Sequence, residues 1–261
     1  MNDGGPKGVF DIQVKSKGTV SLDLSRDVFV KHEKVIQGSF SGLKKGSFGS
    51  LGCTFEHCDF RKMRPSQIVF ASGREQSRYI SCIFDGSRFD HIIAGQSRFE
   101  SCSFRNVVLN RLFTHAAEFI NCTFSGVIKS SVFFGKVTGN YSEDTERRTN
   151  EFLDNDFADA QFVDVGFREG VDLSRQKLPS GSEYVYLRDA AKTLHELRNR
   201  YVQATHSPRR EAVFRFLKYP EEEVEAGQTQ LLLCKSSEVN LDAGAVDAIW
   251  EELRGIDRQM T

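Results

Sequence analysis

The centre of the sequence repeats itself at a spacing of twenty residues. The three aligned segments are SRYISCIFDGS from Ser77, SRFESCSFRNV from Ser97 and AEFINCTFSGV from Ala117. Each contains an aromatic residue, two further residues, a cysteine, one more residue and a phenylalanine, and a fourth copy begins at Phe55, twenty-four residues before Tyr79. A fixed period of this length indicates a solenoid, in which each repeat packs on its neighbours.

A shorter period of five residues runs inside the repeat. Counting in fives from Tyr79 gives a series of mostly large side chains: Phe84, Phe89, Ala94, Phe99, Phe104, Leu109, Thr114, Phe119, Phe124, Lys129 and Phe134. Small residues stand two positions earlier, among them Cys82, Cys102, Cys122 and Val132. Five matches neither the helical nor the strand period. It predicts a chain that turns a corner every five residues, with four edges per coil and coils paired as parallel strands about 4.8 Å apart.

These positions resemble the repeats of pentapeptide-repeat proteins, from about Phe40 to Leu173. The resemblance implies a right-handed, four-sided parallel β-helix with Phe or Leu at the centre of each edge. The predicted fold class is therefore mainly β, with a smaller α-helical region after it. One branch of that family protects DNA gyrase by mimicking duplex DNA, and the resemblance brings in that function as an alternative.

The sequence divides into four parts. We predict an N-terminal β cap at residues 1–37, the β-helix at 38–173, a linker at 174–181 and a helical region at 182–261. The alternating apolar residues from Val9 to Gln37 predict the strands of the cap. The ladder of phenylalanines is expected to resume at Phe152 and to end near Leu173.

Three helices are expected in the C-terminal region. One runs from Glu183 to Thr205 with Ser182 as its N-cap, the second starts at Ser207 and Pro208 and ends near Pro220, and the last spans about Asp242 to Ile256 after Asn240. The segment from Leu194 to Glu223 resembles the helical hairpin that often follows pentapeptide solenoids. We expect it to cover the last coil and to pair two chains as a homodimer.

Two interruptions of the period are candidate contact sites. They lie near residues 61–75, where four extra residues and a basic cluster occur, and at residues 136–150, KVTGNYSEDTERRTN. Insertions in a solenoid map to loops on one face, often the binding face, although a solvated corner gives the same pattern. The candidate partner-binding residues are Arg61, Lys62, Arg64, Arg74, Tyr141, Glu143, Asp144, Glu146, Arg147, Arg148, Asp154, Asp159, Asp164 and Trp250.

Charge gives a test of DNA mimicry. Residues 150–172 carry seven carboxylates and one basic residue, whereas residues 1–78 carry thirteen basic and eight acidic ones. Duplex DNA carries one charge per about 1.7 Å of axis, so a mimic requires a continuous acidic face. Here the excess of acidic residues is confined to about one coil. Aspartate is also common at the corners of this fold, which explains the same residues without DNA mimicry.

Motifs for catalysis or metal binding are few. Cys53, His57 and Cys58 lie close together, but we expect both thiols to point inward as small packing groups and His57 to point elsewhere. The glycines between Gly38 and Gly52 match neither nucleotide-binding spacing. We therefore predict no enzyme activity, no cofactor and no metal, and a cytoplasmic protein without a membrane segment.

The function predicted from the sequence is a non-enzymatic scaffold that presents a rigid surface to another protein. Protection of DNA gyrase or topoisomerase by DNA mimicry is the first alternative. An effector or enzymatic activity of the C-terminal region is the second, and it predicts a polar pocket in that region.

Overall fold

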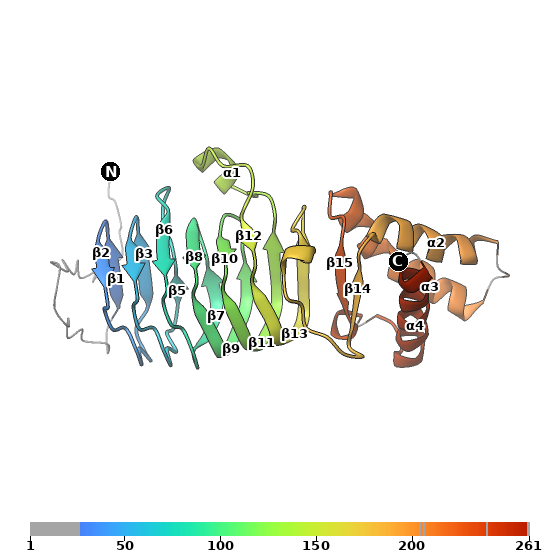
Figure 1. Ribbon diagram of the computed structural model, residues 1–261, viewed down its shortest axis with the longest axis horizontal. Coiled ribbons are helices and arrows are strands. Elements are labelled where there is room, and N and C mark those ends of the chain that lie inside the picture. Colours follow the sequence, from blue (N-terminus) through green and yellow to red (C-terminus); the bar gives the residue numbers. More distant parts are fainter. Residues whose placement is uncertain (1–26, 204, 206, 239, 260–261) are drawn as a thin grey trace, which may run out of the picture.

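The chain forms a parallel β-solenoid of stacked coils, followed by a smaller helical region at its C-terminal end (Figure 1). The computed structural model describes residues 27–203, 205, 207–238 and 240–259. Consecutive strands alternate between two sheets, so each coil contributes to both. The seven-stranded sheet contains β1 (Val28–Lys31), β3 (Phe48–Leu51), β5 (Ile68–Val69), β7 (Arg88–Ile93), β9 (Ser103–Phe113), β11 (Thr123–Phe134) and β13 (Asp156–Arg168). The six-stranded sheet contains β2 (Lys34–Ile36), β4 (Thr54–Glu56), β6 (Ser77–Ile80), β8 (Ser97–Glu100), β10 (Glu118–Ile120) and β12 (Phe152–Leu153).

The solenoid begins earlier in the sequence than the repeat suggested. Val28 of β1 pairs in parallel with Phe48, and Val35 of β2 pairs with Phe55. Residues 28–37, which the sequence placed in the cap, therefore form a coil of the solenoid. Residues 1–26 of the expected cap lie outside the described residues.

The corners explain the period of five. Ser101, Asn106 and Arg111 adopt left-handed φ values of 54°, 53° and 57°, and equivalent corners recur in the neighbouring coils. The fourth corner is the turn from Thr114 to Ala117, closed by a hydrogen bond from the Ala117 amide to the Thr114 carbonyl at 3.3 Å. Each coil is thus four short edges, and each edge can turn one large and one small side chain inward.

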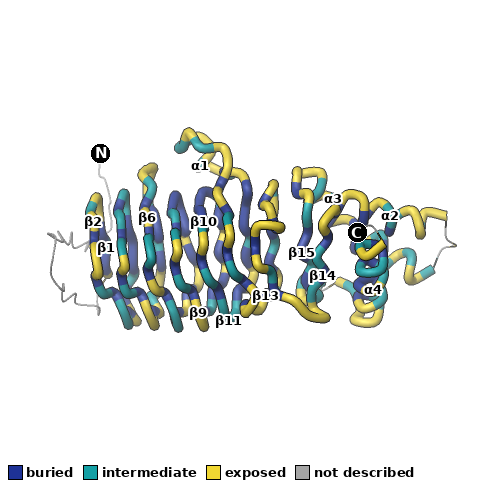
Figure 2. Tube along the Cα trace, in the orientation of Figure 1, coloured by how far each residue is buried: buried dark blue, intermediate teal, exposed yellow. Residues whose placement is uncertain are grey.

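Two stacks of aromatic rings form the core. In one, Phe60, Phe84, Phe104 and Phe124 lie with successive ring centroids 4.6–4.9 Å apart and planes within 11° of parallel. In the other, Tyr79 stacks between Phe55 and Phe99, each at 4.9 Å. The interior is filled by side chains along its length (Figure 2).

The repeat cysteines are small packing groups, as predicted. Their side chains are buried, and the Sγ–H of Cys82 donates to the Phe55 carbonyl and that of Cys102 to the Tyr79 carbonyl, at 3.4 and 3.2 Å. Burial raises the pKa of the Cys102 thiol, which makes it a poor nucleophile. His57 is exposed at a corner, and the described residues contain no cluster of three metal-ligating side chains.

The count in fives fails in β11. A bulge between Phe124 and Gly126 shifts the register, so Ile128 pairs with Leu109 and Lys129 pairs with Asn110. The next corner, at Ser130, follows the Gly126 corner by four residues instead of five. The assignment of Lys129 to the core is therefore wrong: Ile128 is buried there and Lys129 is exposed. Ser131 likewise takes the buried small position that was expected for Val132.

The C-terminal region starts with a strand, which the sequence analysis did not predict. After the 3-10 turn η1 (Leu173–Arg175), β14 (Tyr184–Leu187) pairs antiparallel with β15 (Leu231–Cys234). The first helix, α2 (Ala190–Val202), is thus shorter than the expected 183–205. Asp189 caps it, accepting from the Lys192 amide at 3.1 Å, so the assignment of Ser182 as the cap is wrong.

The remaining helices follow the expectation more closely. Ser207 caps α3 (Pro208–Glu225) with Pro208 in the first turn, as predicted, but the helix continues through Pro220 to Glu225. The 3-10 turn η2 (Lys235–Ser237) leads to α4 (Ala243–Gln259). Asp242 accepts from the Ala245 amide at 2.9 Å and is the cap in place of Asn240.

The β14–β15 pair lies between the last coil and the helices (Figure 1). Leu232 and Cys234 pack on the solenoid core, whereas Leu231 belongs to the helical core. The buried Gln228 accepts from the Val171 amide at 3.0 Å and donates to the Val171 carbonyl at 2.8 Å. The helical region therefore covers the last coil. None of the helices described is long and apolar enough to cross a lipid bilayer.

Candidate interaction surface

The first insertion is shorter than the sequence indicated. Val69 pairs with Gly49, twenty residues earlier, but Arg78 pairs with Thr54, twenty-four residues earlier. The four extra residues therefore fall within residues 70–77, which we call the first insertion. Arg74 lies in it.

The other basic candidates belong to a regular coil and lie outside the first insertion. Arg61 makes an ion pair with Asp59 at 2.7 Å, and Lys62 occupies a left-handed corner with φ of 56°. Arg64 is exposed, and its amide donates to the Leu43 carbonyl within the coil. The expected loop at 61–75 is thus corrected to 70–77.

The second insertion, residues 136–150, lies where the sequence placed it. Phe119 pairs with Phe99, twenty residues earlier, and with Phe152, thirty-three residues later. An antiparallel bridge between Lys136 and Thr149 closes its neck. Its tip carries the short helix α1 (Tyr141–Asp144), which projects from the solenoid and is largely exposed (Figures 1 and 2).

Asn150 fixes the base of the second insertion. Its buried side-chain amide donates to the Phe134 carbonyl at 2.9 Å and to the Lys136 carbonyl at 3.0 Å. Inside the tip, Arg148 donates to the Ser142 carbonyl at 3.0 Å. The insertion is therefore held by its own hydrogen bonds at both ends.

The two insertions touch each other. The Arg74 guanidinium lies 2.7 Å from the Asp144 carboxylate, so the structure brings together two residues that are seventy apart in the sequence. The Arg74 side chain is 80% exposed and that of Asp144 is 31% exposed. A surface pair of this kind contributes at most about 1 kcal/mol, so it does not by itself hold the two segments.

A buried carboxylate joins them more firmly. The side chain of Glu118 on β10 is 2% exposed. It accepts from Gln76 of the first insertion at 2.9 Å, and from Arg147 of the second insertion at 2.7 Å. Arg98 and the Glu151 amide also donate to it, at 3.1 and 3.2 Å. Burial of a charge is costly unless it is paired and hydrogen-bonded, and here both conditions are met.

Arg98 extends this network along the sheet. Its guanidinium also pairs with Glu100 at 2.9 Å and Glu151 at 2.6 Å, and Glu100 pairs in turn with Arg78 at 2.7 Å. Burial opposes the charge on Arg98, but the hydrogen bonds to Glu151, Glu100 and Glu118 outweigh it and raise its pKa. The Arg98 guanidinium therefore keeps its charge in this partly buried network.

The sequence analysis missed this network, although a signal was present. Arg78, Arg98 and Glu118 are spaced by twenty residues, and each immediately precedes the aromatic residue of its repeat. They are neighbours across the sheet because β6, β8 and β10 pair in register. The twenty-residue period therefore holds for polar positions as well as apolar ones, and it aligns these three side chains.

Aromatic contacts support the tip of the second insertion. The His115 ring stacks on Phe134 at 4.8 Å and faces Tyr141 at 6.5 Å, and its Nδ1 is 2.7 Å from the Thr138 hydroxyl. Burial lowers the pKa of His115, which favours the neutral ring in this stack. Tyr141 is thus partly buried at the base of α1, whereas Glu143 and Glu146 are exposed.

The acidic coil is partly neutralised by basic residues. Asp154 pairs with Arg175 at 2.9 Å, and Asp156 pairs with Lys177 at 2.8 Å, both on the exposed face. Asp159 and Asp164 are exposed on other edges of that coil. The structure therefore does not bring these aspartates into one site with the insertions.

Trp250 is not a surface residue. Its side chain is 0% exposed and packs edge-on against Phe216 with ring centroids 5.8 Å apart. Its place as a candidate partner contact is therefore corrected: it belongs to the core of the helical region.

Comparison with known proteins gives little further information. No protein-family model matches the chain, and no curated protein matches it. One solved structure found by the search is "Structure of QnrB1 (Full length), a plasmid-mediated fluoroquinolone resistance protein". The two sequences are 14% identical. The match covers 58% of this chain and 82% of the QnrB1 chain, with a TM-score of 0.18.

Proposed function

We propose that the protein is a pentapeptide-repeat scaffold without enzymatic activity that binds another protein through its two insertions. The period of five, the left-handed corners and the stacked phenylalanines support the family assignment. The joining of both insertions by Glu118 is the observation that carries the binding proposal.

A fixed loop is better suited to binding than a mobile one. Binding by a mobile loop costs conformational entropy, and pre-organisation removes that cost. Here Glu118, Asn150 and Arg74 hold the base and the side of the second insertion, while Glu143 and Glu146 remain exposed at its tip. The contacts thus fix a projecting surface without covering it.

DNA mimicry receives less support from the same structure. The carboxylates of Asp154, Asp156 and Glu151 each pair with a basic side chain, which interrupts the acidic surface of that coil. A supercoiling assay of DNA gyrase with a fluoroquinolone present tests this alternative. We expect no protection, and protection by the purified protein would reverse the preference.

The binding proposal is tested by removing the second insertion. Since Lys136 and Thr149 already form an antiparallel bridge, residues 137–148 can be replaced by an Asn-Gly turn. Glu118 keeps Arg98 and Gln76 as partners in this variant. We expect an unchanged circular dichroism spectrum and loss of the protein that the intact chain captures from host extract, identified by mass spectrometry.

A matched control uses the basic residues of the regular coil. Arg61→Ala and Arg64→Ala change charge on a different part of the solenoid and leave both insertions intact. Capture should survive these substitutions. Capture that persists without residues 137–148, or that depends on Arg61 or Arg64 instead, would contradict the proposal.

A homodimer through the C-terminal helices remains a separate prediction. Their large apolar side chains are mostly buried within the chain, with Val202 and Tyr219 exposed among the described helical residues. Light scattering after gel filtration measures the mass directly, and a monomer of 29.5 kDa would exclude the dimer.

A further inference from the structure

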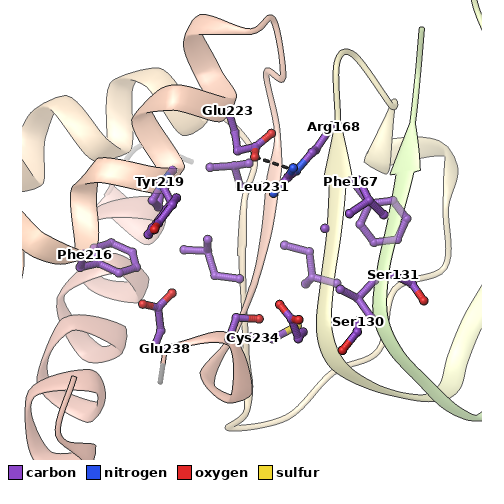
Figure 3. Close-up of a pocket in the computed structure, with 18 of the residues that line it drawn as sticks. Ser130, Ser131, Phe167, Arg168, Phe216, Tyr219, Glu223, Leu231, Cys234 and Glu238 are labelled. Carbon is purple, nitrogen blue, oxygen red and sulfur yellow. Dashed lines mark ion pairs between the residues drawn. The ribbon is translucent and has the colours of Figure 1, made fainter. Parts of the chain in front are cut away.

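A cavity of about 560 Å³ lies where the C-terminal region meets the last coils (Figure 3). Phe113, Val132 and Gly166 line it from the solenoid, and Phe216 and Leu231 line it from the other side. Its volume falls within the range of about 300–1,000 Å³ that small-molecule sites occupy. It is distinct from the insertions and lies in a different part of the molecule.

The solenoid wall of the cavity is apolar because of the register. Phe113 pairs with Val132, and Val132 pairs with Gly166, so the three form one outward-facing column across β9, β11 and β13. Gly166 has no side chain, and a Cβ there would meet only the Arg168 side chain at ordinary contact distance. The column therefore ends in a hollow at the level of the cavity.

One carboxylate in the cavity lacks a counter-charge. Among the described residues, none donates a hydrogen bond to the Glu238 side chain or pairs with it, and Figure 3 shows it with Phe216 and Tyr219 among the residues that line the cavity. The other charged side chains of the lining are two acids and two arginines. Glu223 pairs with Arg168 at 2.7 Å, Arg215 donates to the Asn240 carbonyl at 3.2 Å, and Asp164 is exposed at the rim.

We propose that this cavity binds a small amphipathic amine, with its ammonium group against Glu238 and its apolar part along Leu231, Phe216 and the Phe113 column. A cation supplies the missing charge, whereas an anion would add a second negative charge beside Glu238. Tyr219 and Phe216 also line the cavity, and aromatic rings attract cations. The apolar wall accounts for the remainder of the ligand.

Charge and shape are tested with three probes of equal chain length. Octylamine, 1-octanol and octanoate are titrated at pH 8 by calorimetry, with the fluorescence of the single tryptophan as a second readout, because Trp250 contacts the cavity residue Phe216. We expect octylamine to bind at least tenfold more tightly than 1-octanol, and octanoate to bind least.

Substitutions separate the cavity from non-specific apolar binding. Glu238→Gln keeps the size of the side chain and should weaken octylamine about tenfold while leaving 1-octanol unchanged. Glu225→Gln, an exposed acid outside the cavity, should change neither. Gly166→Val fills the hollow and should weaken both octylamine and 1-octanol.

Absence of octylamine binding to the intact protein overturns the proposal. So does octylamine binding that is the same for Glu238→Gln as for the intact protein. Gly166→Val is compared only after its circular dichroism spectrum matches that of the parent, and the Glu238→Gln comparison decides the proposal without it.

Discussion

Two glutamates show how differently a carboxylate can be placed in this protein. Glu118 is almost fully buried, yet Gln76, Arg98 and Arg147 all donate to it. Glu238 is only partly buried but has no such donor among the described residues, and desolvation raises its pKa to about 7. Glu118 joins the two insertions, whereas Glu238 is a partly buried carboxylate without a partner among the described residues.

Glu118→Gln should lower the free energy of unfolding by about 3 kcal/mol, because the partly buried Arg98 and Arg147 lose the buried carboxylate that they share. Hydrogen exchange should also become faster in residues 136–150, which lose the anchor of Arg147. Urea unfolding and exchange mass spectrometry measure the two effects. Glu143→Gln at the exposed tip is the control, with an expected change within about 0.5 kcal/mol.

Glu238→Gln should stabilise the protein at pH 8 and have little effect at pH 4. The raised pKa means that the folded state binds this proton more tightly than the unfolded chain, in which a glutamate has its ordinary pKa of about 4.5. The ionised form therefore costs stability, increasingly as the pH rises from about 4.5 through 7. Thermal unfolding of both proteins across this range tests the sign, and a difference that grows toward acid pH would contradict it.

At the scale of elements, the strand β11 shows that the register between two coils can change by one residue while the core stays filled. The bulge after Phe124 removes one residue from an edge, and the buried position moves from Lys129 to Ile128. Ile128→Ala should therefore destabilise the protein by about 2–5 kcal/mol, as large-to-small core substitutions do. Lys129→Ala should change the unfolding midpoint little, and a larger effect at Lys129 than at Ile128 would contradict this register.

The solenoid itself was predictable because its signal is repeated many times. Phe84, Phe104 and Phe124 occupy equivalent positions, so an error at one copy is corrected by the others. An irregularity that occurs only once in the chain has no other copy against which it can be checked. The bulge in β11 and the four extra residues near Arg74 each occur once, and only the pairing register locates them.

The C-terminal region and the candidate site were less predictable for a related reason. Tyr184 and Leu187 fit a helical stripe, but β14 forms because β15 is available as its partner forty-four to fifty residues further along the chain. The insertions themselves could be located roughly from the sequence. Their connection through Glu118 could not, since it depends on contacts between segments that are far apart in the sequence.

At the scale of the whole molecule, the C-terminal region matters most for how the solenoid ends. Gln228 uses its side-chain amide as a further strand would use its backbone, accepting from Val171 and donating to the same residue. Gln230 adds a contact of 2.7 Å from the Leu173 amide. The final coil is thereby hydrogen-bonded although no further coil follows it.

Gln228→Ala should lower the free energy of unfolding by about 2 kcal/mol, because the buried Val171 amide and carbonyl lose their partners. Chemical denaturation measures the loss. Glu225→Ala, an exposed substitution on the nearby end of α3, should change the unfolding midpoint much less. An equal effect of the two would show that Gln228 does not have this role.

A repeat of this kind has no intrinsic length, since every coil offers the next one the same row of amides and carbonyls. Parallel edges left open in this way act as templates for copies of the same chain. The two glutamines and the β14–β15 pair thus determine the length of the molecule. Any change that detaches them would leave the amides and carbonyls of the last coil without these partners, and an open edge of this kind favours association between chains.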